Sequence, residues 1–333
     1  MKEYFILIRP YGMLFLGFTP VFGAIANGEF TFTHLLLLLL VGVLAHVFTF
    51  VQNDYYDIEI DTQSRYVSTR PLVTGDVSKA AAFIMFFSSF LLSTLIVIIY
   101  FFSWYSLIVL FLSFLFITLY NKCSKRFYAM EYVLSLGVFT YGVFGALTVS
   151  NSISYLVVIV SLVGFMQWLF SVGVSANLKD VEFDVKQGVS TTPTLLGVKT
   201  IDKKLVIPIG FWVYAFGIKV IHILIVLLPF LLGYTSIYVY NLPIPGVCFL
   251  VITITLLYLT RKILSTPMGE RDKMLIYEGL QEGLAFLLIP VVLMSYIIEN
   301  IGVVPILSLI LLLVTWPLFW FRILYGKRMI PLE

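Results

Sequence analysis

Residues 33–61 read THLLLLLLVGVLAHVFTFVQNDYYDIEID. The first part of this stretch is mostly apolar, and about 20 apolar residues let a helix cross the roughly 30 Å hydrocarbon core of a bilayer. The stretch then ends in an acidic string, and acidic side chains on a membrane helix are costly unless a cation binds them. The sequence therefore predicts a transmembrane helix that ends in a functional acidic cluster.

The composition of the whole chain is that of a polytopic membrane protein. Of the 333 residues, 60% are hydrophobic and 12% are charged, and the mean hydropathy is +1.03. Because a soluble domain has about 25% charged residues, we expect an all-α transmembrane helix bundle. We expect neither nucleic acid nor an obligate protein partner. The two cysteines, Cys123 and Cys248, are too few for a disulfide framework.

Ten apolar segments are long enough to span a membrane. They cover about residues 8–27, 33–54, 80–102, 104–121, 130–149, 153–178, 204–232, 246–263, 277–298 and 303–325. The first segment lacks a small-residue cleavage site, so we expect a retained helix rather than a signal peptide.

The positions of Lys and Arg predict the orientation of these segments. Loops after the even-numbered segments and both termini carry basic residues, whereas loops after the odd-numbered segments carry none. By the positive-inside rule the basic loops and both termini are cytoplasmic. With nine segments, Lys327 and Arg328 would lie on the opposite side. The basic C-terminus therefore supports the tenth segment, 303–325.

A second acidic string, NLKDVEFD, occupies residues 177–184. Both strings contain Asp-apolar-Glu-apolar-Asp, at 57–61 and at 180–184. Each follows an even-numbered segment, so both strings are expected on the cytoplasmic side, where they can share one site.

Oxygen ligands recur in both strings at intervals that place them on one face of a helix, namely three, four and seven residues. The residues with this spacing are Asn53, Asp54, Asp57 and Asp61 in the first string and Asn177, Asp180 and Asp184 in the second. We expect Glu59 and Glu182 to point elsewhere.

A Pro-x-x-x-Gly pattern follows each string, as RPLVTG at 70–75 and TPTLLG at 192–197. We interpret this as an internal repeat, in which the helix and loop at 33–79 resemble those at 153–203. The expected organisation is a single domain, 1–333, with two related helix bundles that face each other across one cavity.

Carboxylates with oxygen-bearing neighbours suit Mg²⁺, which commonly bridges a few carboxylates to phosphate oxygens. The three histidines, His34, His46 and His222, are scattered and do not indicate zinc. Cations that could bind a phosphate lie close in sequence, although membrane topology alone could also explain them. These candidates are Arg65, Arg70, Lys122, Lys125, Arg126 and Lys179. A metal-bound diphosphate beside a membrane suggests ionisation of an allylic prenyl diphosphate.

Lys219 is the one basic residue well inside an apolar segment, and His222 follows one turn later. An ionisable residue within a membrane is a functional candidate. The alternative is that Lys219 pairs inside the bundle or extends its amine towards the interface.

The paired motifs resemble those of the UbiA superfamily of intramembrane prenyltransferases. NDYYDIEID is similar to the family's Asn-Asp-x-x-Asp-x-x-x-Asp, and KDVEFDVKQGVSTTPTLLG at 179–197 is similar to its Asp-x-x-x-Asp motif with the Gly and Thr-x-Pro-like stretch that follow. IRPYG at 8–12 and RPLVTG also look like family segments. The resemblance covers residues from about 5 to 300. It implies nine transmembrane helices around a central cavity, to which 303–325 adds a tenth.

The resemblance also implies roles for individual residues. The implied metal ligands and catalytic residues are Asp54, Asp57, Asp61, Asp180 and Asp184, with two Mg²⁺ ions. The implied diphosphate-binding residues include Asn53, Asn177, Lys179 and Arg65. The family often has a Tyr followed four residues later by a Lys. Here Tyr120 is followed by Ser124, and Lys125 comes one residue later.

The leading hypothesis is therefore an Mg²⁺-dependent enzyme that transfers a prenyl chain from an isoprenyl diphosphate to an aromatic or other lipophilic acceptor in the membrane lipid phase. A glycerol phosphate ether-lipid acceptor is an alternative. Two other classes also place carboxylates on membrane helices, namely CDP-alcohol phosphotransferases and ion-coupled transporters.

Overall fold

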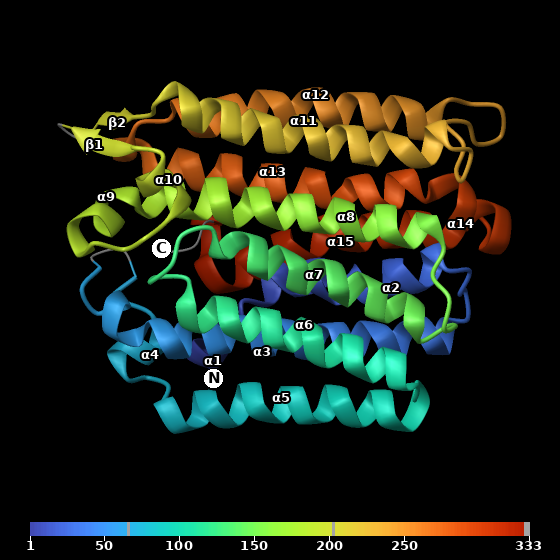
Figure 1. Cartoon of the computed structure of the whole chain (residues 1–333), viewed down its shortest axis with the longest axis horizontal. Helices are drawn as coiled ribbons and strands as arrows, with labels where there is room; N and C mark the ends of the chain where they lie inside the picture. Colours follow the sequence, from blue (N-terminus) through green and yellow to red (C-terminus); the bar gives the residue numbers. More distant parts are fainter. Residues whose placement is uncertain (65–66, 202–203, 330–333) are drawn as a thin grey trace. The chain divides into compact units, whose positions relative to one another are not determined.

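The structure, a computed structural model, describes residues 1–64, 67–201 and 204–329. Nearly all of the secondary structure in these ranges is helical, which confirms the predicted all-α fold (Figure 1). The helices form two compact units. Unit 1 comprises Met1–Lys122, Thr140–Val157 and Leu312–Glu333, and unit 2 comprises Cys123–Phe139 and Val158–Leu311.

Unit 1 is built around α3, a 30-residue helix at Phe32–Asp61, which packs against α2 (Met13–Ala26) and α5 (Lys79–Tyr100). The side chain of Ser78 caps the start of α5 by accepting a hydrogen bond from the backbone N–H of Ala81 (3.2 Å). The other elements of unit 1 are α1 (Lys2–Ile8), η1 (Pro10–Gly12), α4 (Pro71–Thr74), α6 (Trp104–Cys123), η4 (Gly326–Arg328) and parts of α7 (Met130–Leu147) and α15 (Val303–Tyr325).

Glycines let α2 approach its neighbours closely within unit 1. A Cβ atom on Gly42 of α3 would lie 2.2 Å from the backbone oxygen of Gly17 on α2. A Cβ atom on Gly145 of α7 would lie 1.9 Å from the backbone oxygen of Pro20. Small residues are common at helix contacts in membranes because close packing there replaces the hydrophobic effect. These contacts fix α3, and with it the first acidic string, against α2.

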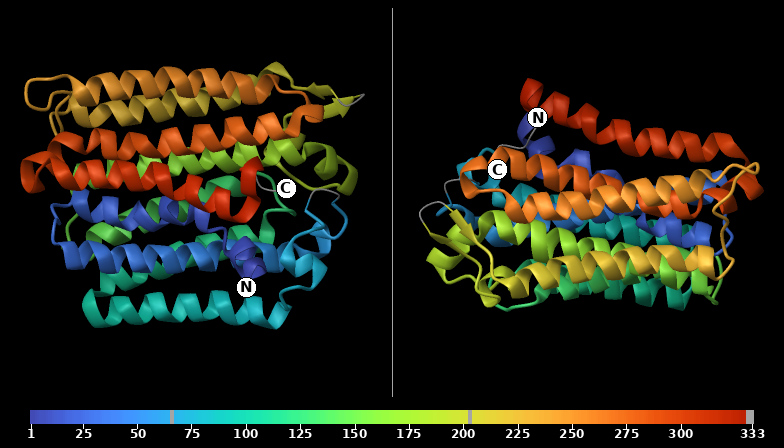
Figure 2. Two further views of the ribbon diagram at one scale, coloured as in Figure 1. Left: turned by 180° about the vertical axis from the view of Figure 1, so that it is seen from behind. Right: turned by 90° about the horizontal axis from the view of Figure 1, so that it is seen from above.

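Unit 2 carries the second acidic string on a long helix with a π-helical turn inside it. This helix consists of α8 (Tyr155–Phe170), the π turn η2 (Ser171–Ala176) and α9 (Asn177–Gln187). Helix α12 (Ile244–Ser265) packs against α11 (Ile209–Leu231) and α13 (Arg271–Val292) (Figures 1 and 2). The other elements of unit 2 are α10 (Thr192–Leu195), β1 (Lys199–Ile201), β2 (Lys204–Val206), η3 (Met268–Glu270) and α14 (Met294–Ile301).

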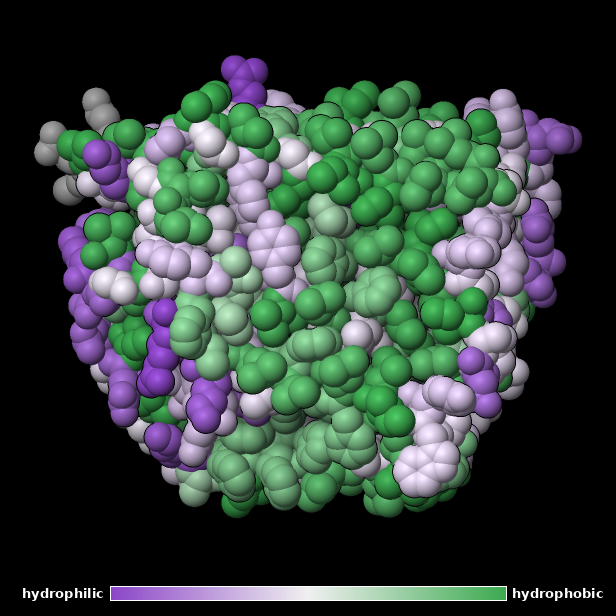
Figure 3. Space-filling model, viewed as in Figure 1, coloured by the Kyte–Doolittle hydropathy of each residue, from purple (hydrophilic) through white to green (hydrophobic). Residues whose placement is uncertain are grey.

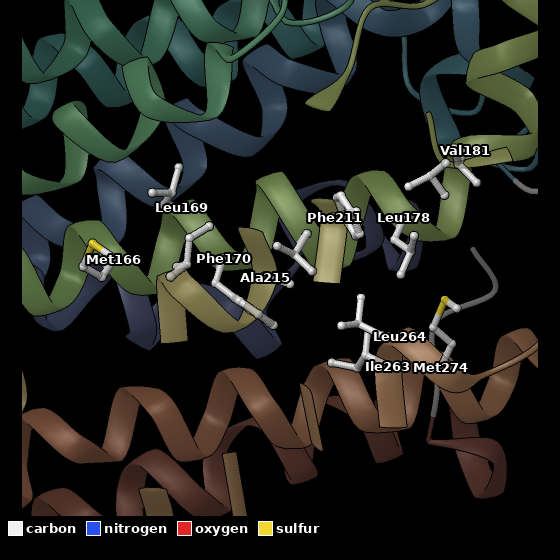
Figure 4. Close-up of a cluster of buried hydrophobic side chains, with 13 residues drawn as sticks. Met166, Leu169, Phe170, Leu178, Val181, Phe211, Ala215, Ile263, Leu264 and Met274 are labelled. Carbon is white, nitrogen blue, oxygen red and sulfur yellow. The ribbon is translucent and has the colours of Figure 1, made fainter. Parts of the chain in front are cut away.

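A hydrophobic core inside unit 2 anchors α9. Leu178 and Val181 of α9 belong to a buried cluster with Phe211 of α11, Ile263 of α12 and Met274 of α13 (Figure 4). Burying a side chain of this size contributes about 1.5–3 kcal/mol. The apolar face of α9 is therefore fixed, and this constrains the polar face that carries the acidic residues.

Nine helices in the described ranges are long and apolar enough to cross a membrane. The count is ten when Lys2–Ile8 and Pro10–Ala26, which meet at 41°, are taken as one bent span. The helices thus confirm an integral, polytopic membrane protein, and α15 supplies the expected C-terminal helix. In unit 2, hydrophobic side chains cover the surface of α11 and α12 in Figure 3, as expected for helices that face lipid.

The ends of several helices differ from the sequence-based expectation. The segment expected to end at residue 54 continues to Asp61, and the one expected to end at 178 continues to Gln187, so both acidic strings lie within helices. The hydropathy pattern stopped at the first charges. On the buried face of a helix, however, charges can continue where partners compensate them.

Two other segments begin at different residues from those expected. The segment expected to start at 204 starts at Ile209, because Lys199–Ile201 and Lys204–Val206 pair as the antiparallel strands β1 and β2 and Pro208 precedes the helix. The two strands lie beyond the ends of α11 and α12 in Figure 1. The segment expected at 277–298 begins at Arg271, and its end is divided between α13 and α14. The charged residues of its first turn lower the local hydropathy, so the hydropathy pattern did not indicate this earlier start.

The two Pro-x-x-x-Gly segments have similar local structures. Pro71 begins α4, and Gly75 follows it with φ 83°. Pro193 lies in the first turn of α10, and Gly197 follows with φ 77°. A positive φ of this size favours glycine at the end of a helix. The similarity is local, and the internal repeat, the single domain 1–333 and the central cavity stay predictions.

Candidate functional site

The first acidic string forms one buried face at the end of α3. Asp54, Asp57 and Asp61 are 3%, 6% and 6% exposed, whereas Glu59 is exposed. Asn53 donates a hydrogen bond from Nδ2 to Oδ2 of Asp57 (3.4 Å). The spacing of three, four and seven residues thus places the carboxylates on one side of the helix, as the sequence predicted.

Two arginines compensate the charge of this face. Arg9 Nη2 donates to Asp54 Oδ1 (2.7 Å), and Arg70 Nη1 donates both to Asp54 Oδ1 (3.2 Å) and to Asp61 Oδ2 (2.8 Å). Hydrogen bonds between charged groups are stronger than those between neutral groups. Carboxylates as deeply buried as these require such partners.

Arg9 was not among the site residues predicted from the sequence. It lies at the break between α1 and η1, where its backbone has φ 55° and ψ 59°, a left-handed conformation unusual for a residue other than glycine. His46 Nε2 lies 2.9 Å from the carbonyl oxygen of Ile8 and 3.2 Å from that of Arg9. The Arg9 guanidinium also lies over the Phe50 ring (5.4 Å to the centroid). The sequence signal that could have identified Arg9 was the family-like segment IRPYG at 8–12.

The second acidic string has different surroundings. Asp184 is 1% exposed, but the side chain of Asp180 is 32% exposed. Arg271, at the start of α13, donates from Nη2 to Asp180 Oδ1 (2.9 Å) and from Nη1 to the backbone oxygen of Lys179. Glu182 is paired with Lys186 (2.8 Å), and the expectation that it points away from the ligand face stays a prediction. Arg271 is a second residue that was not predicted.

Two further acids of α13 lie beside the second string. Glu278 lies close enough to Lys179, Asp180, Arg271 and Glu282 to interact with them electrostatically. Glu278 and Glu282 are one helical turn apart within an apolar segment, a pattern that marks functional candidates in membrane helices. That pattern could have identified them from the sequence.

Lys219 pairs within unit 2, which is the second of the two interpretations offered by the sequence. Its Nζ donates to Oε1 of Gln167 (2.8 Å) and lies 3.9 Å from the centroid of the Phe170 ring. The side chain is fully buried. A desolvated cation over an aromatic face gains about 2 kcal/mol or more, which offsets part of the cost of burying the charge.

The remaining predicted residues are placed individually. Tyr120 is half-buried and Lys122 is exposed near the end of α6; Lys125 is half-buried and Arg126 exposed in the following turn. Asn177 is half-buried at the start of α9. Arg65 lies outside the described residues. The structure therefore brings Arg70 to the first string and Lys179 into the second, while the roles of the other residues stay predictions.

The oxygen atoms of the first string suit an Mg²⁺ ion that also binds a substrate phosphate. Across the ranges that the structure describes, no three Asp, Glu, His or Cys side chains gather to hold a metal ion by themselves. Protein-bound Mg²⁺ usually keeps several waters and is held by one or two carboxylates together with substrate phosphates. A buried face of carboxylate and amide oxygens, compensated by arginines, provides this kind of partial ligand set.

Comparison with known proteins identifies related sequences. A model of the UbiA prenyltransferase family matches residues 14–266. A 4-hydroxybenzoate octaprenyltransferase of Legionella pneumophila is 30% identical over 194 residues, which cover 56% of this chain and 66% of that protein. A 4-hydroxybenzoate octaprenyltransferase of Francisella tularensis is 25% identical over 205 residues, which cover 60% of this chain and 71% of that protein.

Several solved structures share the fold. A UbiA homologue from Aeropyrum pernix aligns with a TM-score of 0.64 at 15% identity, over 86% of this chain and 97% of its own. A digeranylgeranylglyceryl phosphate synthase aligns with a TM-score of 0.61 at 20% identity, over 86% and 96%. A UbiA homologue from Archaeoglobus fulgidus, bound to DMAPP and Mg²⁺, aligns with a TM-score of 0.59 at 18% identity, over 86% and 99%.

Proposed function

The chain belongs to the UbiA prenyltransferase family and is an integral membrane prenyltransferase, and on this premise we propose that it transfers a prenyl chain from an isoprenyl diphosphate to an aromatic acceptor of the 4-hydroxybenzoate type, in an Mg²⁺-dependent reaction. The observation that carries the proposal is the buried carboxylate face of Asp54, Asp57 and Asp61 with Arg9 and Arg70 bound to it.

The second string is assigned to the same diphosphate. Asn177, Asp180 and Asp184 have the spacing of the first string, and Lys179 adds a cation next to them. Two Mg²⁺ ions, one for each string, are the expected stoichiometry. The A. fulgidus homologue, which was solved with DMAPP and Mg²⁺ bound, supports this type of ligand.

The chemistry follows from the charges on this chain. Bound Mg²⁺ supplies positive charge that stabilises the departing diphosphate. Arg9 and Arg70 are suited to bind phosphate oxygens, because a guanidinium presents its N–H donors in a fixed fork. Breaking the allylic C–O bond leaves an allylic cation on the prenyl chain. An acceptor carbon then attacks that cation and loses its proton to a base.

An aromatic acceptor is preferred because the relatives found by sequence are 4-hydroxybenzoate octaprenyltransferases. A glycerol phosphate ether lipid is the second candidate, since a digeranylgeranylglyceryl phosphate synthase shares the fold. Family membership argues against the CDP-alcohol phosphotransferase and transporter alternatives.

The test is a transfer assay with purified protein in detergent. Geranyl diphosphate and geranylgeranyl diphosphate serve as donors, and 4-hydroxybenzoate or geranylgeranylglyceryl phosphate serves as acceptor, with Mg²⁺ or with EDTA. We expect a prenylated aromatic product with Mg²⁺ only. Product from the glycerol phosphate acceptor alone would move the assignment to the second candidate. Transfer that EDTA leaves unchanged would refute the metal dependence.

We further propose that both acidic strings and both termini face the cytoplasm, which the distribution of Lys and Arg supports. Single cysteines at Gly188, after the second string, and at Asn151, between α7 and α8, would report the side in a background without Cys123 and Cys248. A membrane-impermeant maleimide added to intact cells should label Asn151→Cys but not Gly188→Cys. The reverse pattern would invert the topology.

A further inference from the structure

The π turn before the second acidic string is held by polar side chains at two points. A π turn adds one residue to a helix, which rotates the face of everything after it by about 100°. The direction of Asp180 and Asp184 relative to α8 therefore depends on whether residues 171–176 keep their π geometry.

The first point of attachment is Gly173. Glu131 of α7 is 3% exposed, and its Oε1 accepts hydrogen bonds from the hydroxyls of Thr192 on α10 and Tyr214 on α11 (3.3 Å for Tyr214). A Cβ atom on Gly173 would lie 2.9 Å from the Tyr214 hydroxyl and 3.0 Å from Glu131 Cγ. Glu131 and Tyr214 thus pack closely against the side of Gly173 on which a Cβ atom would stand.

The second point is Ser171, the first residue of the turn. Its hydroxyl accepts a hydrogen bond from Gln167 Nε2 (2.9 Å) and also pairs with the carboxyl group of Glu282. Gln167 is in turn bound by Lys219. Side chains from α7, α10, α11 and α13 therefore meet on one turn of helix.

A contribution to folding stability does not by itself explain why these buried polar side chains surround the π turn. Buried polar clusters are often less stable than well-packed apolar residues of similar volume, and some are instead associated with a specific geometry. The adjoining segment, from Leu178 to Val181, is anchored by apolar packing, so polar contacts are not required to bury it. Glu131, Thr192 and Tyr214, packed against Gly173, are called the clamp here, and what the clamp adds is a fixed rotation of α9.

We propose that Glu131, with Thr192 and Tyr214, is a positioning residue of the prenyl-transfer site. It holds the π turn at Gly173 and so aims Asp180 and Asp184 at the Mg²⁺–diphosphate ligand. This inference rests on the proposed function, because it assigns these aspartates to that ligand. It predicts that loosening the clamp weakens Mg²⁺ binding even where the protein remains folded.

The test compares Glu131→Gln, Gly173→Ala and Tyr214→Phe with Ser295→Ala. Ser295 is buried and accepts a partly buried hydrogen bond from the backbone N–H of Ser236 (2.7 Å), and it lies on α14, at the other end of unit 2 from α9 (Figure 1). Unfolding temperature is measured for each variant alone, and then during Mg²⁺ titration with geranyl diphosphate present. Binding is thus measured separately from turnover.

Clamp variants should need about 10- to 100-fold more Mg²⁺ for half-maximal stabilisation, a range typical for residues that orient metal ligands. Ser295→Ala should bind Mg²⁺ like the wild type. Glu131→Gln should cause a smaller loss of Mg²⁺ affinity in the Asp180→Asn background than in the wild type, because only Asp184 is then left for it to misdirect. Tyr214→Phe keeps the ring and serves as the folded variant if Glu131→Gln does not fold.

Wild-type Mg²⁺ affinity in Tyr214→Phe and in every clamp variant that folds would overturn the inference, as would an equal loss in Ser295→Ala. The inference would also be overturned if the losses of Mg²⁺ affinity caused by Glu131→Gln and by Asp180→Asn simply add in the double variant. A wild-type protein that transfers no prenyl chain and shows no Mg²⁺-dependent stabilisation would refute the proposed function instead.

Discussion

The two acidic strings share a pentamer and a ligand spacing, but the protein supports them differently. The first lies on an unbroken 30-residue helix, and arginines from two other segments pair with its Asp54 and Asp61. The second follows a π turn, its Asp180 is partly exposed, and one arginine reaches it from α13. Similar ligand sequences can thus be held by buried ion pairs in one case and by helix geometry in the other.

The largest expected effect comes from removing one carboxylate of each string. Asp57→Ala with Asp180→Ala should lower prenyl transfer by about 10³-fold or more, because groups that stabilise charge in a transition state contribute on that order. Single-turnover transfer with saturating Mg²⁺ measures the loss. If the double variant retains more than a tenth of the wild-type rate, the two strings do not form the site.

The next effect separates the two types of support. Arg70→Met leaves the buried Asp54 and Asp61 with one cation fewer, and breaking a buried pair costs about 3–5 kcal/mol. Arg271→Met should cost only about 1 kcal/mol, because exposure of Asp180 screens its pair. Chemical unfolding in detergent without Mg²⁺ measures both. Equal losses would mean that burial does not distinguish the strings.

A smaller effect is expected from His46→Ala, which removes the ring that contacts the carbonyls of Ile8 and Arg9. Loss of one buried hydrogen bond costs about 1–3 kcal/mol. The Arg9 guanidinium should then leave Asp54, so a second variant, Arg9→Met, should add little in the His46→Ala background. Additive losses in the unfolding free energy would show that His46 does not act through Arg9.

The smallest effect is expected from Glu59→Ala. Glu59 lies between the ligands in sequence but is exposed on the other side of α3, so stability should change by no more than about 0.5 kcal/mol. Transfer activity should stay within about twofold of the wild type. A loss comparable to that of Asp57→Ala would contradict the one-sided ligand face.

The membrane fold and the one-sided carboxylate face of the first string were predictable because both depend on short-range periodicity. Long apolar runs and the three-, four- and seven-residue spacing are visible in the sequence itself. Arg9 and Arg271 were not predictable in the same way. Arg9 is 45 residues from its partner Asp54, and Arg271 is 91 residues from Asp180. Helix ends within charged stretches were also missed, because hydropathy cannot distinguish a compensated charge from a solvated one.

By itself the sequence determined an all-α membrane protein with two acidic strings of matched spacing, because hydrophobic length and helical periodicity are local properties of the chain. Tertiary structure decided which cations compensate those acids and how the second set is oriented. Arg9 reaches Asp54 from a left-handed position at the end of α1, and Asp180 follows a π turn against which Glu131 and Tyr214 pack. Both outcomes arise from contacts between distant segments, which no local pattern encodes.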